Sequence, residues 1–253
     1  MSPVEAIGVA IWCFLVALAG GLVGLVLGNL RLPVMLLLAS SPASGGAANI
    51  AVSGVAASAA SIGHVRAGRI NWRLFAWMAP PSVLGALVGG YLAGEISETV
   101  LLLAIAAILV GSGLDLLRWE RPAPAAPGTA ERGLDVRAAV LSGLVIGLLG
   151  GLVGLILGAL RMPALLKLVG EVPSRAVGTN LTVGVLVAVA GLVGHLPSAA
   201  PDWDLLAVGA AASVPGALLG ARLTGKLSER QLVRAIGVAL IVAGTAASVQ
   251  AVT

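Results

Sequence analysis

Apolar runs of about 18 to 25 residues recur along this chain and constrain its fold more than any other feature. A helix needs about 20 consecutive apolar residues to cross the hydrocarbon core of a bilayer. Two runs, 32–39 and 162–170, are too short to cross alone. The long runs are roughly 4–30, 44–63, 74–93, 100–117, 138–160, 176–194, 205–221 and 232–249. We therefore predict an all-α polytopic membrane protein with about eight long spans and two short segments.

Composition agrees with a membrane protein and excludes several other classes. Of the 253 residues, 58% are hydrophobic and 10% are charged, whereas about 25% of an ordinary soluble domain is charged. The net charge of +4 includes no run of five or six like charges, so the basic residues between apolar runs indicate topology and not a nucleic-acid partner. The N-terminus lacks a basic signal-peptide region, and we expect its apolar run to remain as a membrane segment.

The two halves of the chain are copies of each other. Residues 20–33 have the sequence GGLVGLVLGNLRLP and residues 150–163 have GGLVGLILGALRMP, identical at eleven of fourteen positions. After one inserted residue the offset changes from 130 to 131, and Asn49 then matches Asn180. A duplication of half the chain is typical of membrane transporters. We predict a first repeat at 1–117, a cytoplasmic linker at 118–137 and a second repeat at 138–253.

Basic residues in the short loops predict opposite orientations for the two repeats. The loop at 66–73 is basic, whereas its matched loop at 195–204 has no Lys or Arg. Since basic loops stay in the cytoplasm, the repeats are expected to be inverted, with both termini outside. Inversion requires an odd number of crossings in each half, so the short segments must cross as thin or broken spans. The alternative is that each short segment forms a hairpin that enters and leaves on one side.

Glycines at four-residue spacing lead into the two short segments. Small residues at this spacing allow close helix packing, and the proline that follows predicts a break in the helix. A broken helix at membrane depth lines a cavity, and its N–H groups suit an anion. The predicted packing and break positions are Gly20, Gly24, Gly28 and Pro33 in the first half, and Gly150, Gly154, Gly158 and Pro163 in the second.

Arg31 and Arg161 lie beside these predicted breaks. An arginine within a membrane segment is costly and indicates a functional site, although it can instead extend to the membrane interface. The next helix of each half begins with polar residues, among which Asn49 and Asn180 either bridge helices or hold a substrate oxygen. We expect the substrate site to contain Arg31, Asn49, Arg161, Arg175, Thr179 and Asn180.

Sequence motifs for catalysis and cofactor binding are absent. The chain has no GxxxxGK[ST], HExxH or nucleophile-elbow sequence, so we expect no enzyme activity, no catalytic residue and no cofactor. His64 and His195 end predicted helices without a second ligand at helical spacing, so they are expected at the membrane interface and no metal site is predicted. A coupling proton or ion and a homodimer both stay open.

The sequence resembles the TauE/SafE family of sulfite and organosulfur-anion exporters over about residues 6–250. The resemblance rests on the doubled Gly-rich segment, on the P-x-x-x-A-x-G-T-N pattern present here as 173–180 in the form PSRAVGTN, and on the segment RAGRINW at 66–72. The first copy departs from the pattern, with Ala47-Ala48-Asn49 where the family often has Gly-Thr-Ser or Gly-Thr-Asn. The resemblance implies a transporter of small anions in a bacterial inner membrane.

Together, these features predict a secondary transporter, by resemblance an exporter of sulfite or sulfonates. We expect alternating access around a midplane site where the repeats meet, with a small anion and the lipid bilayer as partners. A passive anion channel and a non-transporting membrane assembly protein are the alternatives from other classes.

Overall fold

The computed structural model describes residues 1–92, 97–118, 135–153, 158–195 and 200–252, and every regular element in these ranges is helical. The first half contains α1 (Pro3–Val23), α2 (Gly28–Leu38), α3 (Pro42–Arg66), α4 (Trp72–Tyr91) and α5 (Glu98–Leu117). The second contains α6 (Val136–Val153), α7 (Gly158–Pro163), a π-helical turn η1 (Ala164–Leu168), α8 (Pro173–His195), α9 (Trp203–Thr224) and α10 (Glu229–Val252). The all-α prediction is thus confirmed for the described residues.

Six described helices are long and apolar enough to cross a membrane. They are Pro3–Val23, Pro42–Arg66, Thr99–Leu117, Pro173–Val193, Trp203–Thr224 and Glu229–Val252. The described segment Val136–Leu152 is a shorter apolar helix. The prediction of eight long spans is therefore supported for six of them.

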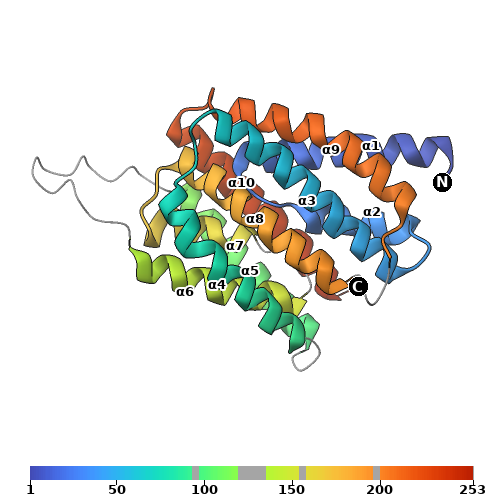
Figure 1. Cartoon of the computed structure of the whole chain (residues 1–253), viewed down its shortest axis with the longest axis horizontal. Coiled ribbons are helices and arrows are strands. Elements are labelled where there is room, and N and C mark those ends of the chain that lie inside the picture. Colours follow the sequence, from blue (N-terminus) through green and yellow to red (C-terminus); the bar gives the residue numbers. More distant parts are fainter. Residues whose placement is uncertain (93–96, 119–134, 154–157, 196–199, 253) are drawn as a thin grey trace, which may run out of the picture.

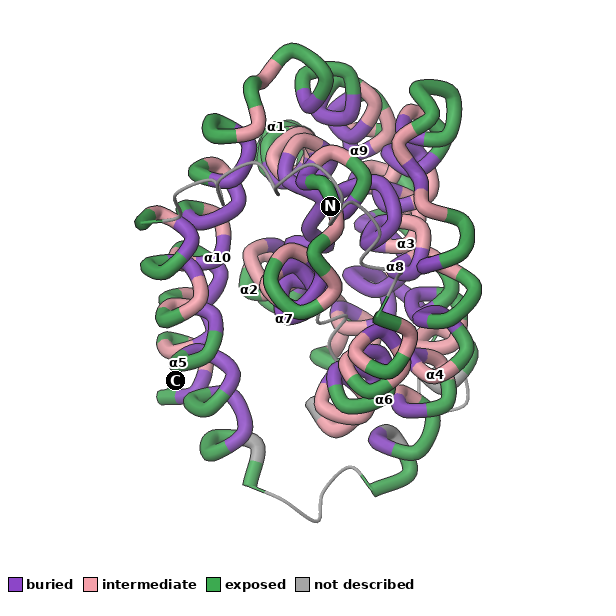
Figure 2. The backbone as a smooth tube through the Cα atoms, turned by 90° about the vertical axis from the view of Figure 1, so that its left-hand side faces the viewer, coloured by how far each residue is buried: buried purple, intermediate pink, exposed green. Residues whose placement is uncertain are grey.

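The helices pack in pairs around a short central pair. The main contacts join α1 with α9, α4 with α6, α5 with α10, and α3 with α8. Seen along the helices, α2 and α7 lie in the middle of the other helices (Figure 2). Exposed apolar side chains such as Val4, Leu37 and Val189 cover the outside, as expected for a surface that faces lipid. The short segments thus lie between the other helices, and the last turn of α2 reaches the surface at Leu37.

The direction of each helix follows from close contacts at glycines. Gly21 on α1 lies against Ala217 on α9, and Met1 lies near Asp204, so α1 and α9 run parallel. By contrast, Gly54 on α3 contacts Ala188 on α8. Gly178 on α8 contacts His64 near the end of α3, so α3 and α8 run antiparallel. The pair α5 and α10 is also antiparallel, since Gly113 contacts Ile241 and Gly244 contacts Val110.

The chain turns back between α1 and α2. At the end of α1, Gly24 takes a left-handed conformation with a φ of 75°. The indole Nε1 of Trp12, in the middle of α1, donates to the carbonyl of Leu30 on α2 at 3.0 Å. A straight continuation would separate these residues by about 27 Å at 1.5 Å per residue. Thus α2 returns beside α1 towards the end of the molecule at which α1 begins (Figure 1).

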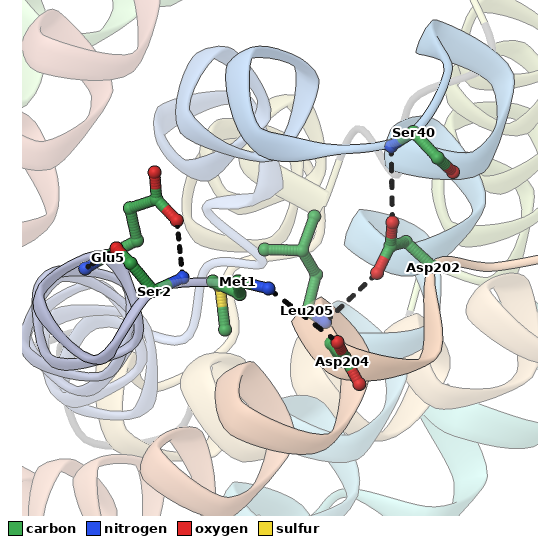
Figure 3. A network of polar contacts seen from close by, with 7 residues as sticks. All are labelled: Met1, Ser2, Glu5, Ser40, Asp202, Asp204 and Leu205. Atoms are coloured by element: carbon green, nitrogen blue, oxygen red, sulfur yellow. Dashed lines mark hydrogen bonds and ion pairs between the residues drawn. The ribbon is translucent and has the colours of Figure 1, made fainter.

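Polar contacts at that end connect the two halves. The carboxylate of Asp202 accepts from the backbone N–H of Ser40 at 3.2 Å and from that of Leu205 at 3.3 Å, while the N-terminal ammonium of Met1 lies 4.0 Å from Asp204 (Figure 3). Partial burial raises the pKa of Asp202, but the N–H donors outweigh this effect and hold the pKa below its ordinary value. Asp202 therefore caps α9 as a carboxylate at neutral pH.

A second set of polar contacts lies at the opposite end. Arg69 donates to the carbonyl of Ala221 at 2.8 Å, and the amide of Asn71 donates to Glu171. Arg69 and Asn71 follow α3, Glu171 precedes α8 and Ala221 lies near the end of α9, so this end carries the basic loop at 66–73. Matched positions thus make cross-repeat contacts at opposite ends, because Asn71 corresponds to Asp202 and Glu171 to Ser40 at the offset of 131.

Candidate functional site

The segment between α1 and α2 and the start of α7 meet inside the helix bundle. The side-chain Nδ2 of Asn180 donates to the carbonyl of Gly24 at 2.7 Å and to that of Gly158 at 2.8 Å. Gly24 begins the interruption between α1 and α2, and Gly158 is the first residue of α7. One asparagine on α8 therefore joins the end of α1 to the start of α7, and the matched Asn49 on α3 donates to Gly28 at 3.1 Å.

Glycine is required where the interruption between α1 and α2 crosses α8. A Cβ at Gly24 would lie 2.5 Å from the Cα of Val177, and the left-handed backbone disfavours other residues. Pro33, by contrast, lies inside α2, which continues to Leu38. The predicted break at Pro33 is therefore wrong. Since Pro33 cannot donate to the carbonyl of Asn29, Gln250 on α10 donates to it instead at 2.7 Å.

The remaining predicted glycine and proline positions fall in three groups. Gly28 and Gly158 begin the short helices α2 and α7, and Pro163 ends α7 where the π-helical turn starts. Gly20 and Gly150 lie within α1 and α6 and are buried. Gly154 lies outside the described residues.

Arg31 is enclosed by three helices. Its side chain is only 1% exposed. One terminal nitrogen, Nη2, donates to Ser53 on α3 at 2.5 Å, and Nη1 contacts Ser213 on α9 at 3.5 Å. The third nitrogen, Nε, is buried without a partner. Within the described residues no carboxylate pairs with Arg31, so its positive charge is only partly compensated by neutral hydroxyls.

A cavity lies against Arg31. Its volume of about 10 Å³ is room for about one water molecule. Its polar lining consists of Arg31 and Ser53, and the rest is apolar or glycine, including Leu181 of α8 and the interruption Leu25–Leu27. A buried cation on a mostly apolar wall is an environment that strengthens its attraction for an anion.

Arg161 is buried to the same degree but has fewer partners. It is 2% exposed, and both Nε and Nη1 lack a hydrogen-bond partner. The position that corresponds to Ser53 is Gly184, which has no hydroxyl. The position that corresponds to Ser213 is Ser82, whose hydroxyl is buried and unpartnered. Arg161 therefore has unused donors in the described structure.

In the described structure, the side chains of Asn49 and Asn180 each have a hydrogen-bonded Nδ2 and an unpartnered Oδ1. Their Nδ2 atoms donate to backbone carbonyls, which fixes the orientation of each amide. The Oδ1 atoms of Asn49 and Asn180 are buried without a partner. Gly158 lies close to both Arg161 and Asn180, since a Cβ placed there would be 3.6 Å from Nη2 and 3.7 Å from Nδ2. Asn180 can therefore offer a ligand an acceptor, and Asn49 can offer an acceptor and its second N–H.

The structure brings four of the six predicted substrate residues to this region, namely Arg31, Asn49, Arg161 and Asn180. Thr179 is buried, but its hydroxyl accepts from the backbone N–H of Asn71 at 3.0 Å. Arg175 is exposed in the first turn of α8. His64 was expected at an interface and is instead fully buried, with Nε2 3.2 Å from the carbonyl of Gly21.

Three serines of the site region were not predicted from the sequence. Ser53 and Ser213 contact Arg31, and Ser82 is the unpartnered match of Ser213. The sequence Ser-Val-x-Gly occurs at both 82–85 and 213–216, and this repetition is the feature from which the pair could have been inferred. Ser53 has no such indication, because only the folded chain places it against Arg31.

Comparisons with known proteins place the whole chain among its relatives. The family model described as "Sulfite exporter TauE/SafE" matches residues 9–247. The chain is similar to the probable membrane transporter protein y4hK of Sinorhizobium fredii, with 29% identity over 95% of this chain and 97% of that protein. It is also similar to the probable membrane transporter protein YunE of Bacillus subtilis, with 35% identity over 40% of this chain and 37% of that protein. No solved structure matches the chain.

Proposed function

Because the chain belongs to the sulfite exporter TauE/SafE family, we propose that this membrane transporter moves small sulfur-containing anions, such as sulfite or sulfonates, out of the cell. The observation that carries the proposal is the pair of buried arginines, Arg31 and Arg161, without a carboxylate partner in the described residues. A lone charge at membrane depth costs about 3 kcal/mol or more. An anionic ligand between the segment after α1 and the start of α7 would offset that cost.

The proposed site retains the residues expected from the sequence, with divided roles. Arg31 and Arg161 supply charge, and the N–H groups at the start of α2 add partial positive charge. Asn49 and Asn180 hold the end of α1 and the starts of α2 and α7 in place and present acceptors. Thr179 fixes the loop at Asn71, and the exposed Arg175 attracts anions towards the inner mouth.

Two inverted repeats joined by residues 118–137 form the proposed framework. The antiparallel packing of α3 with its match α8, and of α5 with α10, supports inversion, because repeats related by an axis along the membrane normal would place matched helices parallel. In this arrangement the interrupted segment of each half passes from one end of the bundle to the other. Each half then has five passes, and the basic loop at 66–73 lies in the cytoplasm.

Alternating access follows from this framework. The polar contacts of Asp202 with Ser40 lie at the outer end, and those of Arg69 and Asn71 lie at the inner end. Releasing one set while keeping the other would open the central site to one side only. The close helix contacts at glycine then allow one repeat to move against the other.

Proteoliposome transport tests the proposal. The purified chain is reconstituted and loaded with sulfite, thiosulfate, alkanesulfonates or carboxylates, with and without a pH gradient. We expect saturable transport of at least one sulfur oxyanion above that of empty liposomes. Linear, non-saturating flux with electrical conductance would favour a passive channel. Absence of flux for every anion would contradict a transporter and favour an assembly protein.

A further inference from the structure

The unpartnered atoms of the central site include acceptors as well as donors. Arg31 and Arg161 have buried donors without partners, and Asn49 and Asn180 have buried acceptors without partners. The same combination occurs in both halves of the molecule. Buried polar groups without partners are uncommon in folded proteins, and each one calls for an explanation. A simple anion such as a sulfonate head group would satisfy the arginines but leave the amide oxygens unpaired.

The orientation of the asparagine amides is well defined. Asn180 donates through Nδ2 to two carbonyls, those of Gly24 and Gly158. A flipped amide would place its oxygen against both carbonyl oxygens and lose both hydrogen bonds, so the assignment holds. The oxygen therefore points away from these carbonyls, and it is an acceptor that only a donor can satisfy.

Arg161 and Asn180 flank the same residue, Gly158. A Cβ placed there would lie close to Nη2 of Arg161 and to Nδ2 of Asn180, so the guanidinium and the amide that carries the unpartnered Oδ1 belong to one part of the site. Ser82, whose hydroxyl is also buried and unpartnered, corresponds to the serine that contacts the other arginine. This hydroxyl can either donate or accept. The buried atoms without a hydrogen-bond partner in the described structure thus match a ligand that has anionic oxygens and a hydrogen-bond donor of its own.

We infer that the central site selects a singly charged oxyanion that carries an O–H or N–H donor. This inference rests on the proposed function and specifies its substrate class. The donor has two chemical sources: a protonated head group, as in hydrogen sulfite, or a hydroxyl or amine on the organic part of a sulfonate. In both cases the guanidinium binds the charged oxygens and an asparagine Oδ1 accepts the hydrogen.

Matched sulfonates test the organic source by calorimetric titration of the purified full-length chain. The series is ethanesulfonate, 2-hydroxyethanesulfonate and 2-methoxyethanesulfonate, in which the methoxy compound keeps the oxygen but lacks the hydrogen. An unpaired buried acceptor weakens binding by about tenfold or more. We expect 2-hydroxyethanesulfonate to bind about tenfold more tightly than either of the other two.

Sulfite at two pH values tests the protonated head group. One pH favours hydrogen sulfite and the other favours the dianion, and methanesulfonate, which does not titrate in this range, reports any pH effect on the protein itself. We expect the affinity for sulfite to fall as pH rises, by more than the affinity for methanesulfonate changes between the same two pH values. A preference seen only in the sulfonate series would identify the organic part of the ligand as the donor. A preference seen only with sulfite would identify the protonated head group.

Equal affinities within the sulfonate series, together with no corrected pH effect, would overturn this inference and leave the transporter proposal intact. Failure of every anion to bind would overturn the transporter proposal and this inference with it. The variants Asn180→Leu and Asn49→Leu add a further readout. Replacement of the asparagine whose Oδ1 accepts the ligand's hydrogen bond should reduce the affinity for 2-hydroxyethanesulfonate to that for ethanesulfonate. The affinity for ethanesulfonate should change less. Unchanged discrimination in both folded variants would also contradict the inference.

Discussion

Arg31 and Arg161 occupy matched positions but have different surroundings. Ser53 and Ser213 contact Arg31, whereas Arg161 keeps two unpartnered nitrogens. One cause is a difference between the repeats, Ser53 in the first and Gly184 in the second, and Ser82, the match of Ser213, makes no hydrogen bond in the described structure. Under the proposed function, Arg161 therefore has more donor capacity left for an anion in this conformation.

A hydroxyl introduced at Gly184 tests that difference. We expect Gly184→Ser to place a hydroxyl beside Arg161, where it competes with the anion and raises the apparent KM for transport about tenfold. Because a Cβ at this position would lie 3.0 Å from the Val26 side chain, Gly184→Ala is the control for packing. An equal KM in both variants would show that the missing hydroxyl does not matter for binding.

The left-handed Gly24 supports a second prediction at the residue scale. Gly24→Ala adds a Cβ 2.5 Å from Val177 at a φ of 75°, so it should destabilise the protein by more than about 1 kcal/mol. Gly46→Ala, at a helical position with open space around it, is the matched control. Thermal unfolding in detergent should show a lower Tm for the first variant only. A Gly24→Ala variant as stable as Gly46→Ala would contradict the assigned turn.

At the scale of the helices, the position of the interruption depends on contacts between distant elements. The sequence predicted a break at Pro33, yet α2 continues through it because Gln250 on α10 satisfies the carbonyl of Asn29. The interruption forms at Gly24 instead, where α8 approaches most closely. Since both causes lie far away along the chain, local sequence rules could place the break only to within about ten residues.

Pro33 and Gln250 should therefore be energetically coupled. Gln250→Ala leaves the carbonyl of Asn29 unpaired, which should cost about 1 kcal/mol of stability. Pro33→Ala restores a backbone donor to that carbonyl, so Gln250→Ala should cost much less in this background. A double-mutant cycle of unfolding free energies measures the coupling. Additive effects would mean that Gln250 does not replace the missing backbone bond.

At the scale of the whole molecule, the sequence predicted the class of fold and the content of the site better than its geometry. Apolar run lengths predicted the helical membrane architecture, and the duplication pointed to Arg31, Arg161, Asn49 and Asn180 together. Arg175 could not be placed, because proximity along α8 does not reveal which face of a helix is buried. The role of Ser53 could not be predicted either, since it arises from packing of α3 on α2.

Inversion of the repeats makes a prediction about matched surface positions. Ser97 and Ser228 correspond at the offset of 131, and both are exposed. In a background with the buried Cys13 changed to Ala, we expect Ser97→Cys to react with an impermeant maleimide on intact cells. Ser228→Cys should react only after permeabilisation. Labelling of both cysteines from the same side would contradict the inverted arrangement.

The most direct test of the central claim is anion transport by Arg31→Gln and Arg161→Gln in proteoliposomes, beside the exposed-arginine control Arg222→Gln. If the buried arginines hold the anion, each central variant should lower transport efficiency about 100-fold, because a hydrogen-bonded charge contributes about 1.5–3 kcal/mol. Arg222→Gln should retain the parental rate, and all variants should show parental amounts in the membrane. Parental transport by both central variants would contradict a site where the segment after α1 meets the start of α7.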